Sequence, residues 1–456
     1  MDKQSRAIQD FVVDHLSNNT TDDSGIAIAP DNMTLLVAPV VEADASTRQY
    51  GDYVSQNLST NDVTDEGATS DGESSEDDSS KDDSSKDDSS KDDSSNTESD
   101  STASDEQAQA VDRLVSSLKL AKESGMHVVL LGNSIEGYKP DAFVKFSDAQ
   151  TIGKLQAEKM VSKLKLDKAS KDNPKYIEVL LPYTAMDEKG NANDSTFAQE
   201  AFRGIWQVLG SYYQKGVVES PSGTLDGKST ENDWQAVAYD AAKEGSTAKV
   251  LDKRLAKTDG QSTLTRIDGI ITMNDYIASE VVKELDDLGY TGSAADINPQ
   301  ITISGIVGNI TGKKDLSRDA VPDPIKSPEN DNANDSSSSD DDADEDTSAS
   351  DKDRDSQWPL VTGYGAYVSN IPSIVNGKQW MTGMEDRQTI ATDIAQACAK
   401  LNKDEALNSM PSTRNSEVGG VKKIPTISEP LLAVSASNLK SALIDPGYIS
   451  LADAGL

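Results

Sequence analysis

Short apolar runs alternate along this chain with segments whose apolar residues recur every three or four positions. The second spacing is typical of helices, and the runs are typical of buried strands. This alternation predicts helices at 8–16, 111–121, 152–164, 197–209 and 277–288. It predicts strands at 34–39, 127–132, 176–181 and 269–272. Gly125 and Gly289 follow two of the helices, where glycine commonly ends a helix. Strands alternating with helices of this length predict an α/β fold with parallel sheets covered on both faces.

Two acidic segments interrupt this pattern. Residues 59–106 contain a repeated Ser-Ser-Lys-Asp-Asp unit, and residues 325–356 contain a serine run followed by aspartates. Both have too few apolar residues to offset the entropy lost on ordering, so we expect disordered inserts. The repeats lack the glycine and terminal glutamate of an EF-hand loop. A solvated spacer is therefore the favoured interpretation, with weak calcium condensation as the alternative.

The charge of the chain narrows its possible partners. The formal net charge is −36, of which −15 falls in 59–106 and −9 in 325–356. Such a negative field repels the phosphates of nucleic acid and anionic lipid headgroups, so neither is an expected partner. A transcription regulator would also need a helix-turn-helix and a basic patch, and the sequence offers neither.

The chain carries little catalytic or metal-binding chemistry. Its only cysteine, Cys398, excludes an internal disulfide, and His15 and His127 form no metal-ligand pattern. No nucleophile–base constellation and no phosphate-binding loop of the Gly-x4-Gly-Lys-Ser/Thr type is present. We therefore expect a protein that is not an enzyme and uses no cofactor or metal. No apolar run is long enough to span a membrane, and none follows Met1 as in a signal peptide.

Several short motifs occur in the order found in the sugar-binding lipoproteins of ABC transporters. GMHVVL (125–130) resembles a "G-I-P-V-I" strand, DAFVKFSD (141–148) resembles "D-x-Y-V-S-F-D-N", and GKLQA (153–157) resembles "G-x-L-Q-A". MND (273–275) and PLVTG (359–363) correspond to "S-N-D" and "V-P-V-S-G", and NGKQWMT (376–382), IPT (424–426) and ASNL (436–439) follow. In this order they resemble the type I periplasmic-binding-protein family, in particular its xylose- and ribose-binding branch.

The resemblance implies two Rossmann-like lobes, joined by three crossovers, that close on a sugar in the cleft between them. It assigns 1–58, 107–147 and 383–427 to an N-terminal lobe and 148–324, 357–382 and 428–456 to a C-terminal lobe. The family's lipoprotein signal, first strand, first helix and second strand have no counterpart before residue 7. The resemblance thus predicts an incomplete N-terminal lobe and an apparently truncated start.

The resemblance also suggests which side chains contact the sugar. Asn274 stands where the family has a sugar-contacting asparagine, with a helix N-cap as the alternative; for Asp275 the cap is favoured over sugar contact. Trp234 corresponds loosely to the family's stacking tryptophan, with ordinary packing as the alternative. The remaining candidates are Asn133, Asn193, Asp194 and Tyr364, while Trp380 is expected to pack in the core or hinge.

The sequence also departs from the family at polar contacts. The family's "D-R" is Asn133-Ser134 here, so its arginine is missing. Its "G-Q-D-A" is Gly363-Tyr364-Gly365-Ala366, so a carboxylate acceptor is missing and Tyr364 is expected to offer a ring or hydroxyl instead. A family lysine is Glu385. Because these three polar contacts differ, the pentose specificity of the family cannot be assigned to this chain.

The function implied is an extracytoplasmic, cell-surface or periplasmic solute-binding protein that delivers a monosaccharide or small oligosaccharide to an ABC permease. The alternative is a degenerate or non-transport surface protein in which the acidic spacers matter most.

Overall fold

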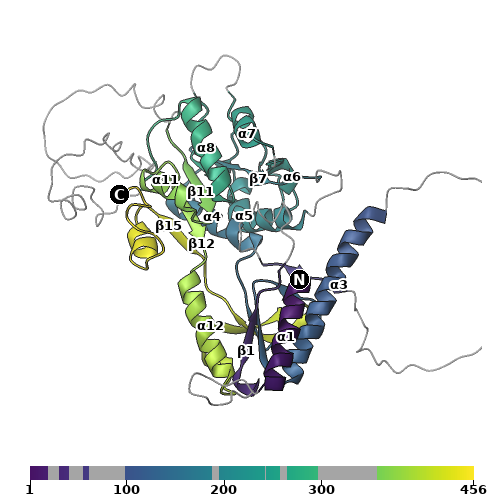
Figure 1. Ribbon diagram of the computed structural model, residues 1–456. Helices are drawn as coiled ribbons and strands as arrows, with labels where there is room; N and C mark the ends of the chain where they lie inside the picture. The colour runs from purple at the N-terminus through teal and green to yellow at the C-terminus, as the bar shows by residue number, and fades with distance from the viewer. Residues whose placement is uncertain are drawn as a thin grey trace, which may run out of the picture. The chain divides into compact units, whose positions relative to one another are not determined.

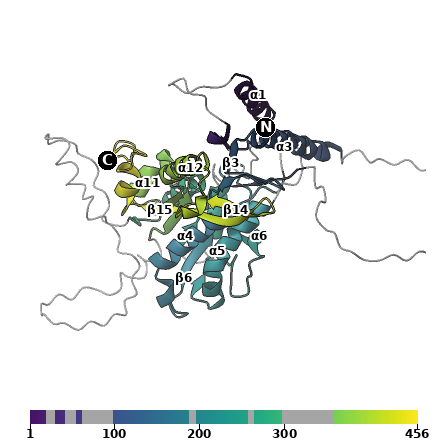
Figure 2. The ribbon, with the colours of Figure 1, turned by 90° about the horizontal axis from the view of Figure 1, so that it is seen from below.

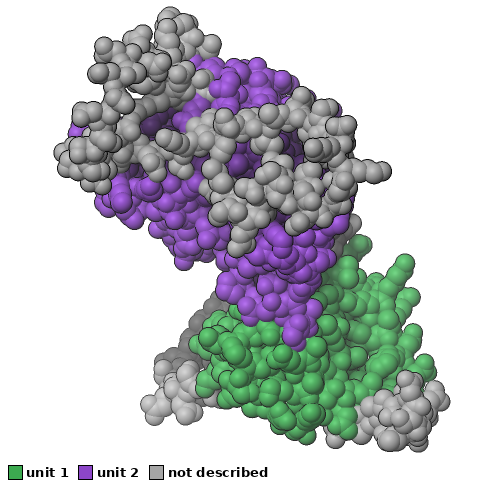
Figure 3. Space-filling view, turned by 90° about the vertical axis from the view of Figure 1, so that its left-hand side faces the viewer, with its two compact units in different colours: residues 1–41, 56–145, 393–428 green, residues 42–55, 146–392, 429–456 purple. Residues whose placement is uncertain are grey.

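A computed structural model describes residues 1–18, 30–40, 55–60, 98–186, 195–241, 243–256, 264–295 and 357–456. The chain divides into two units (Figure 3). Unit 1 comprises 1–41, 56–145 and 393–428, and unit 2 comprises 42–55, 146–392 and 429–456. The chain passes into unit 2 after Lys145, returns after Thr392 and leaves unit 1 again after Ser428.

Unit 1 is built on a five-stranded sheet of order β1-β3-β5-β14-β13. Its strands are β1 (Thr34–Val37), β3 (His127–Leu131), β5 (Ala142–Val144), β13 (Thr413–Val418) and β14 (Val421–Ile427). The other elements are α1 (Asp2–Asn18), η1 (Pro30–Asn32), β2 (Asn57–Leu58), α3 (Glu98–Glu123), β4 (Ser134–Ile135) and η4 (Leu407–Ser409). Strands β1, β3, β5 and β14 are parallel, and β13 is antiparallel to β14.

The core of unit 1 lies between its sheet and two helices. Helices α1 and α3 contact each other (Figure 1), and their buried side chains, such as Val12 and Leu114, join Val128 and Leu130 of β3. Helix α3 ends before Gly125, whose φ of 95° only glycine adopts readily. Most of the periodic apolar residues of the sequence thus lie in this core, but Phe11 and Leu16 of α1 do not, since they are 40% and 54% exposed.

Unit 2 is built on a six-stranded sheet of order β15-β12-β11-β10-β6-β8, parallel except for β15. Its strands are β6 (Lys175–Val179), β8 (Val218–Glu219), β10 (Gly269–Ile271), β11 (Leu360–Tyr364), β12 (Met381–Met384) and β15 (Leu432–Ser435), with a short pair β7 (Leu181–Pro182) and β9 (Ala238–Tyr239). Its longer helices are α4 (Ala149–Lys163), α5 (Thr196–Gln214), α7 (Ser246–Arg254) and α8 (Asp275–Leu288). Shorter ones are η2 (Leu166–Lys168), α6 (Trp234–Val237), η3 (Val368–Asn370), α11 (Ile371–Val375) and η5 (Lys440–Ile444).

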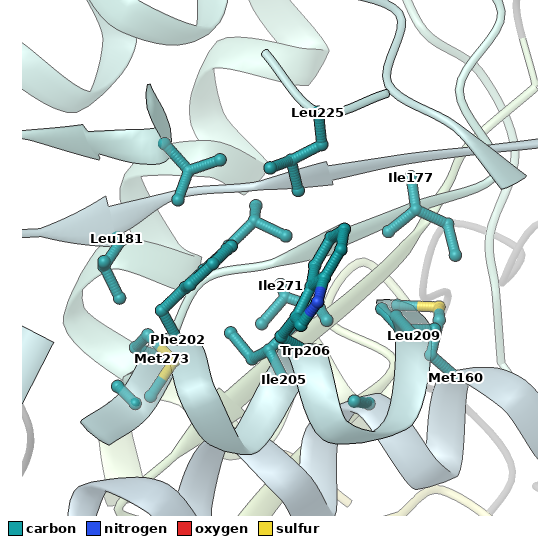
Figure 4. Close-up of a cluster of buried hydrophobic side chains, with 14 of the residues drawn as sticks. Met160, Ile177, Leu181, Phe202, Ile205, Trp206, Leu209, Leu225, Ile271 and Met273 are labelled. Atoms are coloured by element: carbon teal, nitrogen blue, oxygen red, sulfur yellow. The ribbon is translucent and has the colours of Figure 1, made fainter. Parts of the chain in front are cut away.

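Helices cover both faces of the unit 2 sheet. One core joins α4 and α5 to side chains such as Ile177 and Ile271 (Figure 4), and another joins α7 and α8 to Ile270. Ile270 and Ile271 are neighbours in β10, so they point to opposite faces of the sheet. Helices α4 and α5 lie side by side (Figures 1 and 2) and approach closely at Gly204, where a Cβ would lie 2.0 Å from the carbonyl oxygen of Gln150.

The predicted fold class is confirmed: both units are α/β, with mainly parallel sheets packed against helices. Helix α12 (Arg387–Leu401) begins in unit 2 and ends in unit 1. Residues 383–392 fall in unit 2, whereas the sequence placed them in the N-terminal lobe. The pairing of Met384 with Leu432 of β15 holds the start of this segment in unit 2. The hydroxyl of Tyr448, also in unit 2, accepts the N–H of Gln388 and donates to Asp386.

One predicted boundary was wrong. Helix α3 begins at Glu98, inside the insert that was expected to be disordered to residue 106. A helix nucleated by the apolar face around Leu114 extends upstream at little cost, because propagation is far easier than nucleation. The rest of that insert from residue 61, and all of 325–356, lie outside the described residues. Among the described helices, none is both long and apolar enough to cross a bilayer.

Candidate functional site

Polar and aromatic side chains collect where the parallel strands of unit 2 end. Tyr183 and Thr184 follow β6 and β7, and Asn274 follows β10. Tyr367 follows β11, and Glu385 follows β12. Because parallel strands end at the same edge of a sheet, these residues share one edge, which we call the carboxyl edge. Open α/β sheets bind their ligands at this edge.

Asn274 caps helix α8. Its backbone is extended, with φ −140° and ψ 166°, and its Oδ1 accepts the N–H of Ile277 at 2.9 Å. The sequence favoured Asp275 as the cap, and this was wrong, because Asp275 is already the first helical residue. The preceding residue, Met273, has a φ of 68°, a left-handed conformation that is unusual for a side chain of this size.

Asp275 is fully buried and is held by hydrogen-bond donors from the start of β12 and from the turn after β11. Its Oδ1 accepts Nε2 of Gln379 at 2.7 Å, and its Oδ2 accepts Oγ1 of Thr382 at 2.9 Å and the N–H of Tyr367 at 3.1 Å. Asn370 completes the cluster by donating to the carbonyl of Asp275 at 2.7 Å. The side chain of Asp275 thus links the start of α8 to the start of β12 and to the turn after β11.

The electrostatics of Asp275 are set mainly by burial. Removal from water raises the pKa of its carboxyl to about 6, and the hydrogen bonds from Gln379, Thr382 and the backbone oppose that rise. Within the described residues, the groups that donate to this carboxylate are all neutral. It is held by neutral dipoles, including backbone N–H groups of the turn after β11.

Tyr364 lies at the end of β11 and is almost completely buried. Its hydroxyl donates to Oε1 of Glu385 at 3.4 Å, and the same oxygen accepts the N–H of Ser147 at 2.7 Å. Burial raises the pKa of the Glu385 carboxyl and, together with that nearby carboxylate, raises the pKa of the Tyr364 hydroxyl. The hydroxyl of Tyr364 therefore contacts a protein carboxylate, and its role toward a ligand stays a prediction.

Trp234 packs beside the end of β7. Its ring meets that of Tyr183 edge to face, with centroids 5.0 Å apart. Next to this pair, Oγ1 of Thr184 donates to Oδ1 of Asp240 at 2.9 Å, and the Tyr183 N–H donates to the carbonyl of Tyr239 at 2.8 Å. We call Tyr183, Thr184, Trp234 and Asp240 the aromatic rim.

The sequence singled out Trp234 in the aromatic rim but missed the other three members. A signal was available for two of them, because Tyr183 and Thr184 directly follow the apolar run that ends at Leu181-Pro182. Asp240 lies beside Thr184 because β9 pairs with β7, and no local sequence pattern predicts that pairing. Trp234 is only 8% exposed, so most of its ring packs in the protein core.

In unit 1, Asn133 follows β3 at the carboxyl end of that sheet. Its Oδ1 accepts the N–H of Gln56 at 3.0 Å, and its Nδ2 donates to the carbonyl of Pro39 at 3.0 Å. The amide thus joins the segment after β1 to the segment before β2. Whether it also contacts a ligand stays a prediction.

Three predicted positions remain: Asn193, Asp194 and Trp380. Asn193 and Asp194 lie outside the described residues. Trp380 is buried in the core that α4 and α5 share, which agrees with its expected packing role. Among the described His, Cys, Asp and Glu side chains, no group of three or more is arranged to hold a metal ion.

Comparisons with known proteins give a distant likeness. No family model matches the chain, and no curated protein does. A solute-binding protein of an ABC transporter from Clostridium phytofermentans, with bound β-D-glucose, is 19% identical; the match covers 75% of this chain and 79% of that one, with a TM-score of 0.43. A carbohydrate-transporter solute-binding protein from Chloroflexus aurantiacus, in complex with D-glucose, is 20% identical over 75% and 78%, with a TM-score of 0.42.

A third similar structure is AraP, an arabinose-binding protein from Geobacillus stearothermophilus. It is 12% identical over 73% of this chain and 76% of its own, with a TM-score of 0.37. These solved structures are of the kind that the sequence motifs resemble. Because all three TM-scores are below 0.5, the roles of residues in this chain rest on its own geometry.

Proposed function

We propose that this chain is an extracytoplasmic solute-binding protein that captures a sugar at the carboxyl edge of the unit 2 sheet and delivers it to an ABC importer. The observation that carries the proposal is the ordered series of sugar-binding-protein motifs along the chain. It is supported by the position of the candidate side chains at the ends of parallel strands, where open α/β sheets bind ligands.

The aromatic rim has the chemistry that a sugar needs. An aromatic ring offers an apolar face to the C–H face of a pyranose, and hydroxyl and carboxylate groups exchange hydrogen bonds with sugar hydroxyls. Tyr183 and Trp234 supply the rings, and Thr184 and Asp240 supply the polar groups. Such a site holds and releases its ligand without making or breaking bonds.

The first test is a thermal-shift screen of the full chain against D-glucose, D-xylose, L-arabinose and D-ribose. A ligand at 100 times its Kd adds about 2.7 kcal/mol to the free energy of unfolding, which raises Tm visibly. L-glucose is the matched control, because it has the same composition and solvent effects but the opposite handedness. A rise with one D-sugar or with L-arabinose, absent with L-glucose, is the expected result.

A pair of variants then locates the site. Tyr183→Ala removes a ring of the aromatic rim and is expected to weaken binding of that sugar at least tenfold. Tyr212→Ala is the control, since Tyr212 lies in the last turn of α5, where its hydroxyl bonds Asp167 of η2. Equal binding of the sugar by both variants would show that the sugar does not bind at the aromatic rim.

A second candidate function is a degenerate or non-transport surface protein. The observation in its favour is that the carboxylate of Asp275 and the amide of Asn133 are engaged by groups of the protein itself. A cooperative melt that none of the sugars shifts would favour this candidate over the transporter component.

A further inference from the structure

A buried guanidinium bonds both of the segments that carry the aromatic rim. Arg254 occupies the last turn of α7, and its side chain is only 8% exposed. Its Nη1 donates to the carbonyl of Val179 at 2.5 Å, and its Nη2 donates to the carbonyl of Val237 at 2.8 Å. One planar group thus spans two main-chain carbonyls from separate segments.

A carboxylate holds this guanidinium from the side of the sheet. Oε2 of Glu178, in β6, lies 3.4 Å from Nη1 of Arg254. Its other oxygen, Oε1, accepts the hydroxyl of Ser220 at 2.7 Å and the N–H of Ser222 at 2.8 Å. Because the Glu178 side chain is fully buried, its position is fixed by these partners, and it fixes that of Arg254 in turn.

The two carbonyls belong to the two segments that carry the aromatic rim: Val179 precedes Tyr183 and Thr184, and Val237 lies between Trp234 and Asp240. Val179 is the last residue of β6 and comes shortly before Tyr183. Val237 is the last residue of α6, the short helix that begins at Trp234. The two segments also meet through the Tyr183–Trp234 ring contact, the Thr184–Asp240 hydrogen bond and the pairing of β7 with β9. Strands β7 and β9 are two residues long each, and a ladder of that length is weak by itself.

We propose that Arg254 is a positioning residue for ligand binding, which sets the separation of the segments carrying Tyr183 and Trp234. An arginine suits this role because its rigid planar fork reaches two acceptors at once, whereas a lysine is a flexible point charge. Burying the Glu178–Arg254 pair costs desolvation energy, and the gain is a fixed geometry at the aromatic rim. The role in binding rests on the proposed function, but the role in positioning does not.

The test compares Arg254→Lys with a matched control. The control lies in β6, the strand that carries Glu178, at the opposite end from Val179. Lys175, the first residue of β6, forms a buried ion pair with Asp268, 3.9 Å apart, so Lys175→Met removes a comparable pair far from the aromatic rim. Binding of D-glucose and D-xylose is measured by calorimetry. The near-ultraviolet circular dichroism band of the Tyr183–Trp234 pair, assigned by its loss in Trp234→Phe, is measured without sugar.

Arg254→Lys is expected to weaken sugar binding at least tenfold and to lose most of the assigned band, while Lys175→Met keeps both. An unchanged band in Arg254→Lys overturns the positioning role, whatever the sugars do. If the unmodified chain binds neither sugar, the band alone decides about Arg254, and the sugar screen separately decides about the proposed function. If Arg254→Lys gives no cooperative melt, the double variant Glu178→Gln/Arg254→Met, which leaves no unpaired buried charge, takes its place with the same two expected results.

Discussion

The two halves of the carboxyl edge in unit 2 use the same kinds of side chain in opposite ways. In the half formed by β10, β11 and β12, Asp275, Gln379 and Thr382 are buried and bond one another. In the half beyond β6, Tyr183 and Asp240 are partly exposed beside Thr184. The buried side chains of the first half link elements of the fold, and we call them the structural joint. The second half is the better candidate for ligand contact, although motif MND (273–275) lies in the first.

The largest expected effect comes from breaking the joint. Asp275→Ala removes the acceptor that the buried side chains of Gln379 and Thr382 share with the half-buried N–H of Tyr367. We expect a loss of about 3–5 kcal/mol in the free energy of unfolding, measured by urea denaturation. Asp172→Ala is the control, since Asp172 is exposed, and it is expected to change stability by less than about 0.5 kcal/mol. A loss below about 1 kcal/mol for Asp275→Ala would mean that the joint is not structural.

The second effect is a pH dependence that belongs to Asp275. Its pKa of about 6 in the folded state lies above the ordinary value of 3.8, so the folded state binds the proton more tightly than the unfolded chain. The stability gained from that proton is fully present below pH 4 and is lost as pH rises through 6, on the order of 2–3 kcal/mol in total.

The measurement for this effect is urea unfolding of the unmodified chain and of Asp275→Asn at pH 4, 5, 6 and 7. Other carboxyls titrate in both proteins, so their contributions cancel in the difference between the two. The advantage of the unmodified chain over the variant is expected to shrink as pH rises across this range. A constant difference would show that the folded-state pKa of Asp275 is not raised.

The smallest effect is expected in the other half of the edge. Thr184→Val removes the hydroxyl that donates to Asp240 while keeping the shape of the side chain, and should cost about 0.5–1.5 kcal/mol of stability. Thr392→Val, on an exposed position of α12, is the control and should be nearly neutral. A cost for Thr184→Val as large as that for Asp275→Ala would erase the contrast between the two halves.

The fold was accessible from the sequence because it rests on local patterns. The apolar periodicity of α8 and the glycine at its end predicted that helix to within two residues of its observed bounds, Asp275–Leu288. The candidate site was less accessible. Motif MND (273–275) marks a strand end, but the sequence alone does not say that Gln379 and Thr382, a hundred residues later, already occupy the Asp275 carboxylate.

The aromatic rim shows the same limit from the other side. Trp234 was found through a loose family match, whereas Asp240 joins it through the pairing of β9 with β7. That pairing depends on two-residue strands, which carry too little hydrophobic pattern to be recognised. Arg254 is more remote still, since its two acceptors are main-chain carbonyls whose positions only the folded chain defines.

The left-handed conformation of Met273 has a consequence for substitution at this position. A non-glycine residue with such a φ costs about 1–2 kcal/mol, which a change to glycine would recover. However, the Met273 side chain is completely buried, and removing it would cost about 2–5 kcal/mol. The cost of removing the side chain exceeds the strain that glycine would relieve, so Met273→Gly is expected to destabilise the fold on balance.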